Sequence, residues 1–166
     1  RNGAGKSTLV RSILALSKGQ IPSAIQLDGK ITLDKDLRIG EYEQEISSRY
    51  LPLSLEEAVR VSYREKKINI EDRQVKSLLA QYLFDPIMDG QQRIANLSGG
   101  QKARFQLIKM LIGDPDLLIL DEPTNHLDLP SIEELENALD IFAGGILYIS
   151  HDSYFIKRIG GKVVQL

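Results

Sequence analysis

The chain has 166 residues, with 21 Lys and Arg against 23 Asp and Glu, a net charge of -2, and no cysteine. This is the composition of one folded domain; it excludes a disordered tail, a disulfide framework and a cysteine-zinc site, and it shows no general basic excess for nucleic acid. The longest apolar stretch, Ile141–Ile149, is far shorter than the about twenty residues of a membrane-spanning helix, so we expect no membrane crossing.

A glycine-rich segment opens the chain and leads directly into apolar residues at helical spacing, which end near Gly19. Glycines let backbone N–H groups surround phosphate oxygens, and the helix N-terminus adds the positive end of its dipole. We therefore predict a phosphate-binding loop, with Lys6 reaching the β- and γ-phosphates and Ser7 binding magnesium. The alternative is a plain turn at a helix start. The predicted loop comprises Asn2, Gly3, Ala4, Gly5, Lys6, Ser7 and Thr8.

The full phosphate-loop pattern has one more glycine, five positions before Gly5. That position falls one residue before Arg1, and the chain begins with Arg instead of Met. We therefore expect the first glycine, and the strand that feeds the loop, to lie upstream of these residues.

Short strands are predicted after the first helix. Ala24–Leu27 and Lys30–Leu33 flank Asp28-Gly29, a dipeptide typical of tight β-hairpins. We therefore predict a short antiparallel hairpin here. A third short strand is predicted at Leu37–Tyr42.

The middle of the chain is predicted to be helical. Ser54 with Glu57 forms a capping box, which indicates a helix start. A second helix is predicted over 72–84, and a third runs from Gly99-Gly100 to about Ile112. We interpret residues 50–112, approximately, as a helical subdomain within a single domain that spans 1–166.

The last third alternates strands and helices. The apolar run Leu117–Leu120 predicts a strand buried on both faces, and Ser131 with Glu134 predicts the cap of the following helix. The remaining predicted elements are a strand at Ile146–Ile149, a short helix at His151–Ile159 and a last strand at Val163–Leu166. This alternation predicts an α/β fold with a mainly parallel sheet and flanking helices.

Two carboxylates follow the predicted strand Leu117–Leu120. Asp121 and Glu122 stand at its carboxyl end, where open α/β sheets bind their ligands. Asp121 suits magnesium opposite Ser7, and Glu122 is a candidate to orient or deprotonate a water that attacks a phosphate. The alternative, an acidic cap on a turn before Pro123, is less favoured once a phosphate loop is present.

A second anion-binding pattern stands at the start of the predicted helix that runs from Gly99-Gly100 to about Ile112. It consists of Ser98, Gly99, Gly100 and Gln101. With Leu97, this peptide resembles the signature motif of ATP-binding-cassette (ABC) ATPases. In that family the signature of one domain closes over the ATP held by the phosphate loop of a second domain. The resemblance implies the ABC type of P-loop NTPase fold, ATP and Mg²⁺ as cofactors, and a second ABC domain, in the same chain or a second copy, as partner.

Further motifs follow in the family's order. Gln44 stands where the Q-loop glutamine contacts magnesium and the attacking water. Asn125–Asp128, with His126, resembles the D-loop. His151 resembles the switch histidine that hydrogen-bonds the γ-phosphate. Alone, Gln44 would be read as a solvated polar residue and His151 as a surface or capping residue; the register of all the motifs favours catalytic roles for Gln44, Glu122 and His151.

Three segments are similar to the ABC-F branch of the family: Glu122–Asp128, Lys102–Arg104 and Ser150–Phe155. Members of that branch carry two ABC domains on one chain without membrane segments, and many act on the ribosome in translation or antibiotic resistance. The resemblance implies a cytoplasmic ATPase that works as a head-to-tail pair, with the ribosome as partner. We expect these 166 residues alone to bind ATP poorly and to hydrolyse little or none.

Three other functions stay open at this point. The main alternative is the ATP-binding subunit of an ABC membrane transporter, which would use the same chemistry. A nucleotide switch without turnover is disfavoured because Glu122 and His151 are both present. A DNA-repair head of the SMC type would need long coiled-coil arms between phosphate loop and signature, where only about ninety residues lie.

Overall fold

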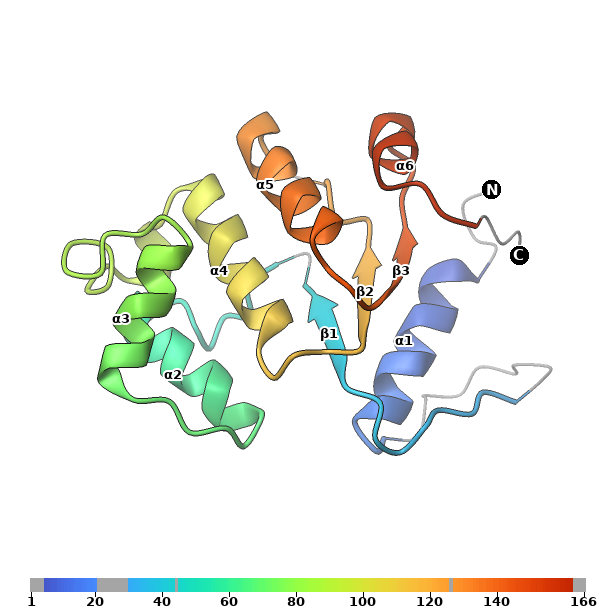
Figure 1. Cartoon of the computed structure of the whole chain (residues 1–166), viewed down its shortest axis with the longest axis horizontal. Coiled ribbons are helices and arrows are strands. Elements are labelled where there is room, and N and C mark those ends of the chain that lie inside the picture. The colour runs from blue at the N-terminus through green and yellow to red at the C-terminus, as the bar shows by residue number, and fades with distance from the viewer. Residues whose placement is uncertain (1–4, 21–29, 44, 126, 163–166) are drawn as a thin grey trace.

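The computed structural model describes residues 5–20, 30–43, 45–125 and 127–162. Helices alternate with parallel strands, so the fold is α/β as predicted (Figure 1). No helix in these ranges is long and apolar enough to cross a membrane. The elements are α1 (Lys6–Ser17), β1 (Ile39–Tyr42), α2 (Leu55–Glu65), α3 (Asp72–Gln81), the 3-10 turn η1 (Ile94–Asn96), α4 (Gly99–Leu111), β2 (Leu117–Asp121), α5 (Leu129–Asp140), β3 (Gly145–Ile149) and α6 (Ser153–Ile159).

The three strands form a parallel sheet in the order β1-β2-β3. The central strand β2 is the predicted apolar run, and its Leu118 pairs with Gly40 of β1 and Ile146 of β3. Figure 1 shows α4 and α5 on one side of the strands, α1 on the other, and α2 with α3 beyond α4. Because the strands are parallel, their carboxyl ends meet at one edge of the sheet, where the chain turns toward α5 and α6.

Gly40 allows α4 to approach the sheet closely. A Cβ atom at this position would lie 2.3 Å from the carbonyl oxygen of Met110 and 2.7 Å from the Cδ2 atom of Leu118. No side chain fits in that space without moving backbone. The glycine therefore sets the distance between the end of α4 and β1.

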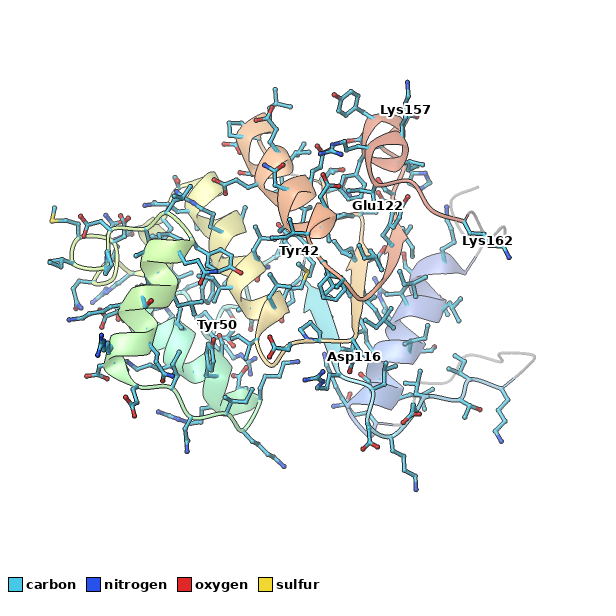
Figure 2. All side chains as sticks on the ribbon, viewed as in Figure 1. Tyr42, Tyr50, Asp116, Glu122, Lys157 and Lys162 are labelled. Carbon is cyan, nitrogen blue, oxygen red and sulfur yellow. The ribbon has the colours of Figure 1, made fainter. Side chains whose placement is uncertain are left out.

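Two clusters of buried apolar residues meet at α4. One joins α2, α3 and α4 and includes Tyr50, labelled in Figure 2, and Phe105. The other joins β1, β2, α4, α5 and α6 and includes Leu118 and Phe155. Phe105 and Ile108 of α4 face the first cluster, whereas Leu107 and Met110 belong to the second. One helix thus connects the helical region to the sheet. The proposed subdomain limits of 50–112 remain a prediction.

Two predicted elements differ in the structure. Lys30–Leu33 forms no strand, and among the described residues no backbone hydrogen bond joins it to another segment. A strand needs such a ladder of bonds. The predicted partner strand Ala24–Leu27 lies outside the described residues, as does the predicted last strand Val163–Leu166.

The start of α5 is also displaced from the prediction. The cap is Asp128, whose carboxylate accepts the Ser131 N–H at 3.1 Å, and not Ser131 with Glu134. Pro130 then occupies the first helical turn, where the missing N–H costs nothing because it would have no partner within the helix. The helix can therefore begin three residues earlier than the Ser131 pattern indicates.

Candidate functional site

The described end of the predicted phosphate loop and the acidic strand end meet at one edge of the sheet. Gly5 caps α1 with a positive φ of 83°, which glycine adopts without strain. Ser7 follows in the first turn, and its Oγ donates to the Oδ1 atom of Asp121 at 3.2 Å. The structure thus brings together two predicted magnesium ligands that are 114 residues apart in sequence. Asn2, Gly3 and Ala4 lie outside the described residues, while Lys6 and Thr8 share the first turn with Ser7.

Glu122 and His151 form the second pair at this edge, where Figure 2 labels Glu122. The Oε2 atom of Glu122 accepts the His151 backbone N–H at 3.1 Å, and its Oε1 atom lies 3.3 Å from His151 Nε2. The Glu122 side chain is 16% exposed and that of His151 is 57% exposed. The carboxylate is therefore held in place while the imidazole ring faces the outside.

The backbone of Glu122 has an uncommon conformation. Its φ is 49°, in the left-handed region that residues other than glycine seldom adopt. Its N–H donates to the Ile149 carbonyl at 2.8 Å, which ties the turn after β2 to the end of β3. The strained turn directs the carboxylate toward His151.

The position of His151 is set by the start of α6. Asp152 caps this helix, because its Oδ1 atom accepts the N–H groups of Tyr154 at 2.8 Å and Phe155 at 3.1 Å. Phe155 is fully buried and packs edge-to-face on Tyr148 of β3, with ring centroids 5.6 Å apart. His151 is thus fixed between the end of a strand and an anchored helix.

The predicted signature forms the N-terminus of α4. Ser98 caps the helix with its Oγ atom, which accepts the Gln101 N–H at 3.2 Å. The Gln101 side chain completes a capping box, because its Oε1 atom accepts the Ser98 N–H at 3.0 Å. A serine hydroxyl has one donor and two acceptor positions, so the Oγ atom that caps the helix still carries a hydrogen to donate. Gly99 and Gly100 follow in the first turn.

The signature does not join the other site residues. Figure 1 shows the N-termini of α1 and α4 at the same edge of the sheet but on opposite sides of the strands. Within the described ranges the predicted signature therefore stands apart from the residues of the predicted phosphate loop. The predicted signature instead lies beside the start of α5: a Cβ atom at Gly99 would lie 4.0 Å from Asp128 Oδ2, and one at Gly100 would lie 3.5 Å from Ser131 Oγ.

The residues before Gln44 are anchored to α4. The Glu43 carbonyl accepts the Gln106 side-chain amide at 2.6 Å, and the Glu43 carboxylate pairs with Lys109 at 2.7 Å. Beside them, burial raises the pKa of Tyr42 to about 12. Gln44 and His126 lie outside the described residues, so their predicted roles stay predictions.

The oxygen donors at the sheet edge fit Mg²⁺. This cation prefers oxygen ligands and is usually held by one or two protein oxygens, substrate phosphates and waters. Ser7 and Asp121 supply a hydroxyl and a carboxylate oxygen 3.2 Å apart. Among the described residues no group of three or more His, Cys, Asp or Glu forms an all-protein metal centre.

An apolar cavity of about 710 Å³ lies between α1, β3 and α6. Lys6 and Ser150 border it, but the rest of its lining is mainly apolar, including Ile13, Ile146 and Ile159. Phosphate groups need N–H donors and cations, so the cavity itself does not match the chemistry predicted for the loop.

Two neighbours of the predicted signature are not evident from sequence spacing. Asp89 accepts the Gln101 side-chain amide with its Oδ1 atom at 3.0 Å, and Asp128 lies beside Gly99. The Asp89-Gly90 dipeptide is a turn signal, but spacing alone does not show that the turn reaches the signature.

Comparison with known proteins gives three findings. A family model described as "ABC transporter" matches residues 1–125. The ABC transporter F family member 5 of Arabidopsis thaliana is 34% identical over 165 residues, which cover 99% of this chain and 22% of that protein. The energy-dependent translational throttle protein EttA of Escherichia coli is 30% identical over 204 aligned residues, which cover 99% of this chain and 35% of that protein.

A solved structure has a similar fold. The crystal structure of the complex of archaeal ribosomal stalk protein aP1 and archaeal ribosome recycling factor aABCE1 matches with a TM-score of 0.62 and 26% identity. The match covers 95% of this chain and 29% of that chain. The chain thus spans about a fifth to a third of the length of these proteins.

Proposed function

The chain belongs to the ABC transporter family, and from that premise we propose that it binds and hydrolyses ATP within an ABC-F-type protein. The observation that carries the proposal is the meeting of four predicted site residues at one edge of the sheet. Ser7 contacts Asp121, and Glu122 contacts His151. These groups come from the first helix and from two strand ends that are distant in sequence.

Each residue has a role that its position supports. Lys6 and the loop amides bind the phosphates, and Ser7 with Asp121 holds Mg²⁺. When bound, Mg²⁺ neutralises the negative charge that develops on the phosphates. Glu122, held by the His151 N–H, orients or deprotonates the attacking water. The exposed His151 ring donates to the γ-phosphate, and Gln44 contacts the metal and the water.

The catalytic unit that we propose is a head-to-tail pair of such domains. The Ser98 hydroxyl and the N-terminus of α4 are suited to a phosphate, yet they stand apart from the phosphate loop of the same chain. In a pair, the signature of each domain would cover the ATP held by the other. The second domain is on the same longer chain or on a second copy.

We further propose that the protein acts on the ribosome, and so in the cytoplasm, as a translation factor or in antibiotic resistance. Two relatives support this step by their names: a translational throttle protein, and a ribosome recycling factor in complex with a ribosomal stalk protein. The alternative is the ATP-binding subunit of an ABC membrane transporter, which the family's description also covers.

The test uses the full-length protein with Glu122→Gln. The change removes the negative charge but keeps the size of the side chain, so we expect retained ATP binding and at least about a hundredfold slower hydrolysis. The closed, ATP-bound protein should then co-sediment with ribosomes only when ATP is present. Normal hydrolysis by this variant would contradict the role of Glu122.

A matched control is Glu133→Gln, which makes the same change on the exposed side of α5. It should hydrolyse ATP at the wild-type rate and release ribosomes normally. If Glu122→Gln stops hydrolysis but shows no ATP-dependent sedimentation, the ATPase proposal stands and the ribosome proposal fails, which favours the transporter alternative.

A further inference from the structure

We infer that Asp89 is a positioning residue for the signature, acting on Ser98 through the side chain of Gln101. This inference rests on the proposed function, because it gives the signature a role in ATP hydrolysis. The contact that carries it is the hydrogen bond from Gln101 Nε2 to Asp89 Oδ1, at 3.0 Å.

The Gln101 amide is held at both ends. Its Oε1 atom accepts the Ser98 N–H at 3.0 Å, while its Nε2 atom donates to Asp89. A capping box alone fixes only the oxygen end of such an amide. With an N–H group on one side and a carboxylate on the other, only one orientation of the amide satisfies both partners. Asp89 therefore locks the residue that closes the cap on Ser98.

The turn around Asp89 is itself held by hydrogen bonds. The second carboxylate oxygen of Asp89 accepts the Asp85 N–H at 2.8 Å, so the side chain also closes its own turn. The next carbonyl, that of Gly90, accepts the Glu56 N–H at 3.0 Å and ties the turn to the start of α2. A Cβ atom at Gly90 would lie 2.3 Å from the Pro86 carbonyl oxygen, so only glycine fits this turn.

The consequence concerns the Ser98 hydroxyl. Its orientation is set by the Gln101 N–H and by the path of the first turn of α4. A catalytic donor has to be held within a fraction of an ångström of its working position. Loss of Asp89 leaves the cap in place but frees the Gln101 amide, which is expected to slow turnover without changing ATP affinity at the phosphate loop.

The experiment is a double-mutant cycle in the full-length protein, with Asp89→Ala, Gln101→Ala and the double variant. Turnover number, ATP affinity and melting temperature are measured for each. We expect Asp89→Ala to lower kcat by about tenfold with ATP affinity within about twofold of wild type. In the Gln101→Ala background, Asp89→Ala should add no further loss of kcat, because its action passes through Gln101.

The matched control is Asp85→Ala in the same turn. Asp85 accepts the backbone N–H groups of Ile87 and Met88, and among the described residues it makes no hydrogen bond with Gln101, so its loss should disturb the turn yet leave kcat within about twofold. Independent, additive losses from Asp89→Ala and Gln101→Ala overturn the inference. Equal loss of kcat in Asp85→Ala and Asp89→Ala also overturns it. A wild-type protein without ATP hydrolysis refutes the proposed function itself.

Discussion

The Glu122 carboxylate is oriented by a backbone group as well as by a ring. Its Oε2 atom accepts the N–H of His151, while the ring Nε2 atom lies near Oε1 at 3.3 Å. A backbone N–H survives any substitution at His151 except proline. Removal of the imidazole ring therefore tests the ring's own contribution and leaves the main anchor of Glu122 in place.

The expected result of His151→Ala is a loss of turnover with little change in ATP binding. A donor aimed at charge that develops in the transition state is worth about a hundredfold in rate. We expect a decrease of that order in kcat of the full-length protein, with ATP affinity measured separately by direct binding. Tyr154→Ala, which removes a side chain that is 74% exposed on α6, is the control. Wild-type turnover in His151→Ala would contradict a catalytic role for the ring.

Sequence patterns identified most elements because their signals are local. The Ser54–Glu57 capping box predicts the start of α2, and Gly99-Gly100 predicts the start of α4; both starts are confirmed. The prediction for the start of α5 is wrong, because Ser131 with Glu134 matches a capping pattern although Asp128, three residues upstream, caps the helix. The site needed tertiary structure: spacing does not show that Ser7 contacts Asp121 across 114 residues, nor that Asp89 reaches Gln101.

At the start of the strands, Arg38 and Asp116 join β1 to β2. Two guanidinium nitrogens of Arg38 donate to the Asp116 carboxylate at 2.9 and 3.1 Å, and the Arg38 N–H adds a third bond at 3.0 Å. These bonds lower the pKa of Asp116 from 3.8 to about 2. Asp116 is labelled in Figure 2 at the edge of the sheet opposite Glu122.

A pH dependence of stability follows from that shift. Because the pKa is lowered in the folded protein, the stabilisation is complete above the ordinary value of 3.8 and is lost as pH falls through about 2. We expect wild type to be more stable than Asp116→Asn at neutral pH, and the difference to vanish between about pH 4 and pH 2. Urea unfolding of both proteins across this range measures it. A difference that does not depend on pH would contradict the ionic origin.

In the molecule as a whole, α4 packs against both apolar clusters. In the cluster that joins α2, α3 and α4, Phe105 packs edge-to-face on Tyr50, with ring centroids 5.7 Å apart. Leu118 lies in the other cluster, which joins α4 to the sheet, α5 and α6. The signature stands at the N-terminus of this shared helix, so packing on either side can affect it. The clusters were predictable as apolar faces, but their meeting at one helix was not, because residues that face them are interleaved along α4.

The presence of two apolar clusters predicts how stability is distributed over the molecule. Phe105→Ala should cost about 3–5 kcal/mol and lower the hydrogen-exchange protection of α2 and α3 more than that of β2. Leu118→Ala should show the opposite pattern, at a cost of about 2–5 kcal/mol. Hydrogen exchange with mass spectrometry on the full-length protein distinguishes the two. Equal loss of protection everywhere in both variants would mean that the clusters open as one cooperative unit.

The positive φ of Glu122 has a consequence for protein engineering. A left-handed backbone at a residue with a Cβ atom costs about 1–2 kcal/mol, which glycine avoids and asparagine reduces. A library screened for heat resistance alone should therefore tend to replace the very carboxylate on which hydrolysis depends. Turnover has to be screened alongside heat resistance, or the most robust clones will be those that no longer work.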